Sequence, residues 1–222
     1  MMTTNKLTKT FASGSLAIGV LAGAVLTATS ASAAVLTWAQ WTSGQDLIQG
    51  DKIVKYVPNL AALDPLNPIG AEAVDKVALT QMGDHYYFRY DAMDGLADTN
   101  KGPGGSFTYT IGVTDPNKSI VGVDLDSNVS SNYGTVTETF GEISNVLVST
   151  NGSQVPPSGF IPIVPKQLLT VTNTLVNTNP GTEGLFDFQN SFHQTTVPEP
   201  GTILGLLAVG GLGLVSRFKK QK

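Results

Sequence analysis

The sequence contains no cysteine among its 222 residues. A domain without cysteine has no disulfide, no thiolate metal ligand and no thiol nucleophile, so burial of a core must hold it together. Histidine is nearly as scarce, since His85 and His193 are the only two. They are 108 positions apart and nothing in the local sequence brings them together. We expect each at the surface or at a strand edge.

Familiar catalytic motifs are missing as well. The sequence has no G-x-S-x-G, no H-E-x-x-H and no phosphate-binding P-loop. Basic residues are few: between residues 34 and 196, seven Lys and Arg stand against sixteen Asp and Glu, a net charge of −9. Nucleic acid repels such a domain, so we expect no nucleic-acid partner. These absences favour a protein that is not an enzyme.

The N-terminus has the three parts of a secretory signal peptide. A basic region with Lys6 and Lys9 precedes an apolar stretch over residues 11–25. Ala31-Ser32-Ala33 then gives the small-x-small pattern that signal peptidase accepts, with cleavage expected before Ala34. The alternative, a buried N-terminal helix, is disfavoured because the run has no polar face. Residues 1–33 are therefore predicted to be a signal helix that is removed on export.

Residues 34–196 are predicted to form one β-domain. Turn-forming residues separate short runs of alternating apolar and polar residues, the pattern of an antiparallel β-sandwich of jelly-roll or immunoglobulin-like type. The proline-rich segment 156–165 is predicted to be a loop crossing between the sheets rather than a hinge. The sets predicted to share a face are Tyr86, Phe88 and Tyr90; Phe107, Tyr109, Ile111 and Val113; Val121, Val123 and Leu125; and Thr135, Thr137 and Thr139.

Four aromatic residues are candidates for stacking on sugars. Trp38 and Trp41 follow the cleavage site closely, so we expect them to dock the N-terminal segment into the core. Tyr87 is predicted on the outer face of its strand, together with His85 and Arg89. Tyr133 is the fourth candidate. These positions allow carbohydrate binding, with exopolysaccharide as the candidate partner.

An acidic loop offers a possible calcium site. Asp91, Asp94, Asp98 and Asn100 supply four oxygen-bearing side chains within ten residues. Such hard oxygen ligands suit Ca²⁺. The competing interpretation is a solvated acidic turn. No other cofactor is predicted.

The C-terminus combines a proline motif, an apolar run and a basic end. Val197-Pro198-Glu199-Pro200 cannot continue a strand, because each proline removes a backbone donor. The apolar run over 202–215 would make a short helix of roughly 21 Å, less than the roughly 30 Å of a bilayer core. Arg217, Lys219 and Lys220 then provide a cytoplasmic stop. This arrangement favours a transient anchor that a membrane peptidase processes, over a plain C-terminal anchor.

In these residues the tail, residues 197–222, resembles that of the PEP-CTERM family of exported bacterial proteins. The resemblance implies sorting by an exosortase-type membrane peptidase and delivery to the cell surface or extracellular matrix. Phe218 interrupts the basic cluster, a mild departure. The same module is also labelled an ice-binding protein C-terminal domain, which is no evidence that this chain binds ice.

The middle of the chain, with "FTYTIGVTDPNKSIVGVDL" and "FQNSFHQTTVPEP", looks similar to cyanobacterial exported proteins that carry this tail. That similarity implies a β-sandwich and no activity. We therefore expect a non-catalytic structural or adhesive protein of the envelope or matrix. The alternative is a secreted calcium-dependent carbohydrate-binding protein or hydrolase, which would need a concave pocket with converging carboxylates or His85.

Overall fold

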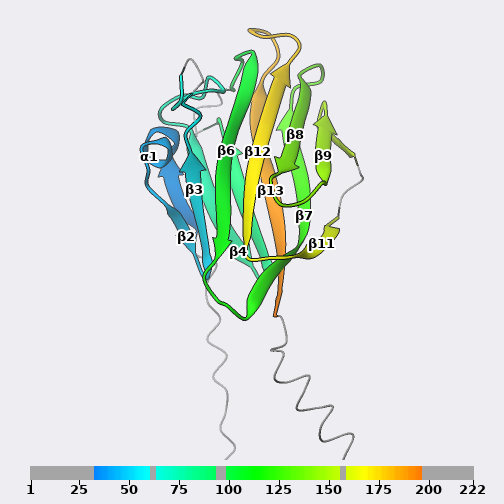
Figure 1. The fold of residues 1–222 in the computed structure, drawn as a ribbon. Helices are drawn as coiled ribbons and strands as arrows, with labels where there is room; N and C mark the ends of the chain where they lie inside the picture. Colours follow the sequence, from blue (N-terminus) through cyan, green and yellow to red (C-terminus); the bar gives the residue numbers. More distant parts are fainter. Residues whose placement is uncertain (1–32, 61–63, 94–98, 156–158, 197–222) are drawn as a thin grey trace, which may run out of the picture. The chain divides into compact units, whose positions relative to one another are not determined.

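The computed structural model describes residues 33–60, 64–93, 99–155 and 159–196. They form two sheets packed face to face, and all neighbouring strands are antiparallel (Figure 1). The six-stranded sheet contains, in order across it, β1 (Ala34–Thr37), β4 (Lys76–Met82), β5 (His85–Asp91), β13 (Leu185–Thr196), β7 (Lys118–Val129) and β11 (Ile161–Lys166). The seven-stranded sheet contains β10 (Ser153–Val155), β9 (Val146–Thr150), β8 (Gly134–Phe140), β12 (Leu168–Asn177), β6 (Gly104–Val113), β3 (Lys52–Val57) and β2 (Leu47–Gln49).

The predicted antiparallel β-sandwich is confirmed. After each of β1, β3, β5, β6, β7, β10, β11 and β12 the chain crosses to the other sheet. The proline-rich segment does connect the two sheets, but its second half forms strand β11 rather than loop. Pro162 and Pro165 are tolerated there because β11 lies at the edge of its sheet, where an unpaired backbone group faces away from the ladder.

The sandwich has two distinct ends. At the first, which we call the tail end, Thr196 completes β13 and three turns gather: 50–51, 83–84 and 114–117. A backbone hydrogen bond from Thr114 N to Asp51 O at 2.8 Å joins two of these turns, and one from Gln194 N to Asp84 O at 2.9 Å ties the third to β13. The opposite end, the far end, carries the loops that follow β3, β5 and β12. In Figure 1 the tail end is at the bottom of the view.

The core is rich in aromatic rings. The predicted inward faces of β5 and β6 are confirmed, with Tyr86, Phe88, Tyr90, Phe107, Tyr109 and Ile111 all at most 1% exposed. Trp38 and Trp41 also lie in the core, as expected, but on the short helix α1 (Trp38–Thr42). A capping box between Thr37 and Gln40 starts this helix, which turns both indoles inward.

One predicted face is wrong. Val121 was expected to share the buried face of β7 with Val123 and Leu125, yet Ile120 takes that place and is fully buried. The cause is an irregularity in the ladder: His193 pairs with Gly122, whereas the next residue, Gln194, pairs with Ile120. The extra residue on β7 shifts its alternation by one, as a β-bulge does.

A polar cluster interrupts the apolar core between β8, β12 and β13. Asn173 and Asn190 are fully buried and exchange two side-chain hydrogen bonds, of 2.9 and 3.1 Å. The Tyr109 hydroxyl donates to Asn190 Oδ1 at 3.0 Å. Glu138, directly opposite Asn173 in the ladder, is also fully buried. Neither of its carboxylate oxygens accepts a hydrogen bond from the residues described.

Candidate functional site

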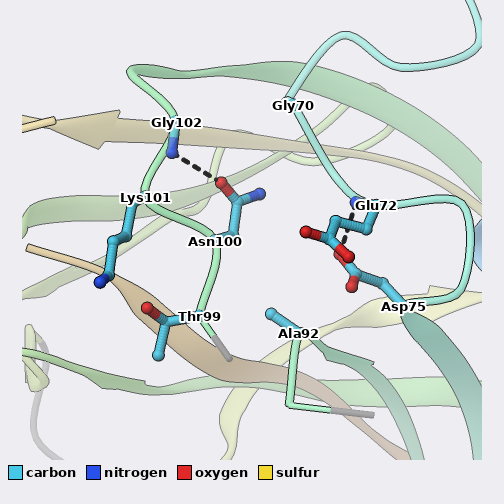
Figure 2. A pocket seen from close by; sticks show the side chains of 8 residues that line it. All are labelled: Gly70, Glu72, Asp75, Ala92, Thr99, Asn100, Lys101 and Gly102. Atoms are coloured by element: carbon cyan, nitrogen blue, oxygen red, sulfur yellow. Dashed lines mark hydrogen bonds between the residues drawn. The ribbon is translucent and has the colours of Figure 1, made fainter. Parts of the chain in front are cut away.

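A cavity of about 260 Å³ opens at the far end of the sandwich (Figure 2). Two loops form it, one before β4 and one between β5 and β6. This volume lies just below the roughly 300–1,000 Å³ of typical small-molecule sites, so only a small ligand would fit. Its lining residues are Gly70, Glu72, Asp75, Ala92, Thr99, Asn100, Lys101 and Gly102.

Two polar side chains of this cavity hold the loops together. Asp75 is 2% exposed, and its Oδ2 accepts hydrogen bonds from Glu72 N at 2.9 Å and from the Tyr90 hydroxyl at 2.5 Å. Burial, followed by the nearby Asp75 charge, raises the pKa of Tyr90 far above its usual range, so this hydroxyl stays protonated and donates. Asn100 donates to Ile69 O and to the Tyr90 hydroxyl, and its Oδ1 accepts from Gly102 N.

Two of the four predicted calcium ligands fall in the described part of the chain, and both have other partners. Asp91 Oδ1 accepts a hydrogen bond from Met93 N at 3.0 Å, and its Oδ2 lies 3.4 Å from the Arg89 guanidinium. Asn100 holds the loops as above. Asp94 and Asp98 lie outside the described residues. Within the described ranges no three His, Cys, Asp or Glu side chains gather as a metal site would require.

The calcium site therefore stays a prediction, with a direct test. If the 91–100 loop binds Ca²⁺, calorimetric titration of the protein should release or absorb heat, and Asp94→Asn with Asp98→Asn should abolish that signal. Asp126→Asn is the matched control, because Asp126 is also an acidic residue on the outside of the sandwich but lies in β7. A titration without heat in the wild type would remove the site.

The two histidines meet on the outer face of the six-stranded sheet. His85 on β5 pairs directly with His193 on β13, and their ring centroids are 4.9 Å apart. The Phe160 ring lies 4.6 Å from that of His85, above Gly122, where any Cβ would crowd Phe160 and His193. His85 Nδ1 is 3.3 Å from the Tyr87 hydroxyl. We call His85, Tyr87, Phe160 and His193 the aromatic cluster.

The structure places both tyrosines that were predicted as sugar platforms. Tyr87 is half-buried on the outer face of β5, as predicted, and belongs to the aromatic cluster. Tyr133 is only 1% exposed, so the prediction that it is a sugar platform is wrong. The sequence missed the cluster because the pairing of β5 with β13 joins residues that are distant along the chain.

The outer face of the seven-stranded sheet has a different character. Between β3 and β9 it presents mainly hydroxyl and aliphatic groups. Lys55 pairs with Asp46 at 2.8 Å, and the Glu142 carboxylate accepts a hydrogen bond from the Thr170 hydroxyl at 2.7 Å. Cross-strand hydrogen bonds of 2.8 Å join two hydroxyl pairs at its centre. We call this surface the hydroxyl face, made of Ser106, Thr108, Thr110, Thr135, Thr137, Thr139, Thr150, Thr170, Thr172 and Thr174.

Most of the predicted processing residues lie outside the described part of the chain. These are Ala31, Val197, Pro198, Glu199, Pro200, Arg217, Lys219 and Lys220. Ala33 is described and exposed, and Ala34 is the first residue of β1, paired with Leu79 of β4. Cleavage before Ala34 would therefore leave β1 whole. Among the described residues, no helix has the length and apolarity to span a membrane.

Comparison with known families bears on the tail. Residues 196–220 match the family model of the PEP-CTERM protein-sorting motif. None of the curated proteins is similar enough to match the chain. The match confirms the resemblance that the tail residues show. The protein is thus an exported β-sandwich that is anchored transiently in the membrane, processed by exosortase, and destined for the surface or matrix.

Proposed function

We propose that the β-sandwich is a non-catalytic structural or adhesive component of the cell envelope or extracellular matrix. Signal peptidase releases it before Ala34, exosortase removes its tail, and the folded domain then contacts matrix polysaccharide. The observation that carries this proposal is the hydroxyl face. It is a broad surface of hydroxyl and aliphatic groups with few charges, on a domain whose net charge is strongly negative.

The chemistry of the hydroxyl face suits extended sugar chains. Threonine offers a methyl group and a hydroxyl that both donates and accepts, which matches the alternating apolar and hydroxyl surfaces of a polysaccharide. The face spans several strands of one sheet, so it can follow a long polymer rather than enclose a single sugar. Its rim adds exposed aliphatic side chains, namely Val57 (38%), Val146 (53%), Leu168 (51%) and Val176 (45%).

A charge placed in the middle of this face tests the proposal. Thr172 pairs with Thr108 on one side and Thr139 on the other, so it lies at the centre of the hydroxyl face. In co-sedimentation with exopolysaccharide from the host, Thr172→Lys should weaken the affinity about tenfold, equivalent to about 1.4 kcal/mol. Gln189→Lys is the matched control, because Gln189 is central on the opposite sheet. Equal binding by both variants and the wild type would contradict the proposal.

The aromatic cluster supports a second candidate, carbohydrate binding by stacking. Tyr87, Phe160 and two imidazoles share one outward patch, and aromatic rings are the usual platforms for sugar faces. Here Tyr87→Ala should reduce binding in a glycan array while the melting temperature changes little. Polysaccharide binding that survives Tyr87→Ala but not Thr172→Lys would favour the first candidate.

A further inference from the structure

Lys52 is a lysine without access to water. It is the first residue of β3, just after the turn at Gly50 and Asp51 that closes the β2–β3 hairpin. Gly50 has φ +57°, and a Cβ there would come within 2.9 Å of the Tyr86 hydroxyl. The side chain of Lys52 points into the sandwich and is 0% exposed. Lysines are almost never fully buried unless they are paired, because desolvating an ammonium group is costly.

The Lys52 amine meets a carboxamide from the opposite sheet. Its Nζ donates to Asp51 Oδ1 at 2.8 Å and to Gln194 Oε1, and it lies 4.2 Å from the ring centroid of Tyr86. Gln194 is 5% exposed and lies near the end of β13. Because Oε1 is bonded to the carboxamide carbon, this contact also places Cδ within reach of Nζ. An amine and an amide carbonyl thus lie together in a site that excludes water.

Asp51 is placed to take a proton from the Lys52 amine. Its Oδ1 accepts hydrogen bonds from Lys52 Nζ and, at 2.7 Å, from the Tyr86 hydroxyl. Its Oδ2 is buried and accepts no hydrogen bond from the described residues, although Lys118 Nζ lies 3.7 Å away. The carboxylate is therefore held in position through Oδ1, while Oδ2 is not used by any hydrogen bond of the described residues.

The surroundings of Lys52 and Asp51 shift the pKa of both groups. Burial lowers the pKa of Lys52. The free-energy cost of forming the neutral amine, which is the nucleophilic form, is therefore smaller than for an exposed lysine. Burial alone would raise the pKa of Asp51, but hydrogen bonds from Lys52 and Tyr86 lower it below its usual range, which favours the carboxylate, the form that can accept a proton. A neighbouring base that activates a nucleophile is the usual requirement for acyl transfer.

We propose that Lys52 and Gln194 form an intramolecular isopeptide bond between the two sheets. Asp51 takes a proton from the Lys52 ammonium group, and the free amine attacks Cδ of Gln194. The protonated Asp51 stabilises the tetrahedral oxyanion. Asp51 then gives its proton to the departing nitrogen and takes a second proton from the attacking nitrogen. That second proton leaves with the ammonia as ammonium, and Asp51 returns to the carboxylate. The new N–C bond forms, the Cδ–Nε2 bond breaks, and one ammonia leaves without any oxidant, reductant or cofactor.

Such a bond would have a clear structural effect. It joins residues 142 positions apart, so it would close most of the domain into one covalent loop and limit the freedom of the unfolded chain. It ties β13, the strand that leads to the sorting tail, to a strand of the other sheet. A chain without cysteine cannot obtain such a cross-link from a disulfide.

Mass spectrometry of the exported protein, purified from its host, tests the bond directly. The intact mass should be lower, by one ammonia or about 17 Da, than the mass calculated for the chain between its observed first and last residues. Trypsin should leave Lys52 uncut and yield a branched peptide in which residues 34–55 are joined to the peptide that begins at Gln167. A full intact mass, with linear peptides ending at Lys52 and containing an unmodified Gln194, would overturn the proposal.

Variants separate the bond from the fold around it. Gln194→Met and Asp51→Asn should both restore the full mass, and both should migrate more slowly than the wild type in denaturing electrophoresis because their chains are no longer looped. Lys118→Met, which removes the more distant cation, should keep the mass deficit. A deficit that persists in Gln194→Met would also overturn the proposal. Loss of polysaccharide binding in Thr172→Lys is a separate result, so the two proposals fail independently.

Discussion

Replacing Trp41 by alanine should lower the free energy of unfolding by about 3–5 kcal/mol. The Trp41 side chain is fully buried, and its ring lies 5.2 Å from both Tyr56 and Phe88 and 5.9 Å from Phe107, measured between centroids. Its removal would leave a large cavity at the junction of α1 with both sheets. Denaturant unfolding of the purified protein, followed by fluorescence or circular dichroism, measures the loss.

The neighbouring tryptophan supplies a matched control. Trp38 Nε1 donates a hydrogen bond to Leu66 O at 3.0 Å, whereas Trp41 Nε1 is buried and donates to no acceptor in the described chain. Trp38→Phe breaks that hydrogen bond, so it should cost about 1 kcal/mol more than Trp41→Phe, which removes an unpaired donor. Equal costs for the two phenylalanine variants would show that the indole of Trp41 has a polar partner.

Replacing Glu138 by glutamine should stabilise the protein at neutral pH, by about 1–3 kcal/mol. Complete burial raises the pKa of Glu138 well above its ordinary value of 4.5, and the neighbouring Asn190 offsets this only in part. Keeping a carboxyl in this site costs free energy at neutral pH, either as a buried anion or by holding a proton that the unfolded chain would release. Glutamine has nearly the same shape and no charge.

The sign of the pH dependence follows from that shift. Above the ordinary pKa of 4.5 the unfolded chain has lost this proton, while the folded chain still holds it until its raised pKa is passed. The stability of the wild type should therefore fall as pH rises through this window, and Glu138→Gln should remove that contribution. Thr137→Ala, a change at the next position on the outer face, should leave the slope intact. An unchanged slope in Glu138→Gln would contradict this account.

Local pattern predicted much of the fold. Alternation along β5 and β6 identified the inward residues correctly, because each strand has one face in the core and the side-chain period is two. The alternation of apolar and polar residues failed as a guide where a strand contains an extra residue. The bulge opposite His193 places Val121 outside the core, and the sequence of β7 contains no residue that predicts a bulge there.

Polar residues in the core were harder to predict. Glu138 lies on the inward face that the alternation of β8 predicts. A charged side chain is normally expected at the surface, yet tertiary packing buries this one completely. The meeting of Lys52 with Gln194, and that of His85 with His193, depends on which strands face or pair with each other. Such contacts join distant parts of the chain, so local sequence carries no signal for them.

The three surfaces of interest occupy different parts of one sandwich. The hydroxyl face covers the seven-stranded sheet, the aromatic cluster lies on the six-stranded sheet, and the cavity opens at the far end, away from Thr196. The Lys52–Gln194 contact lies at the tail end, beneath the last strand. A matrix protein of this design would be reinforced next to its sorting tail and would keep both sheet faces free for binding.

The most direct test of the account is the intact mass of the protein in the membrane, surface and medium fractions of its host. We predict a chain in the surface or medium fraction that starts near Ala34 and ends near Pro198-Glu199-Pro200. That result would show an exported domain that acts apart from its hydrophobic tail. A chain found only in membranes and still carrying residues 217–222 would contradict the account, because the tail would then be a permanent anchor.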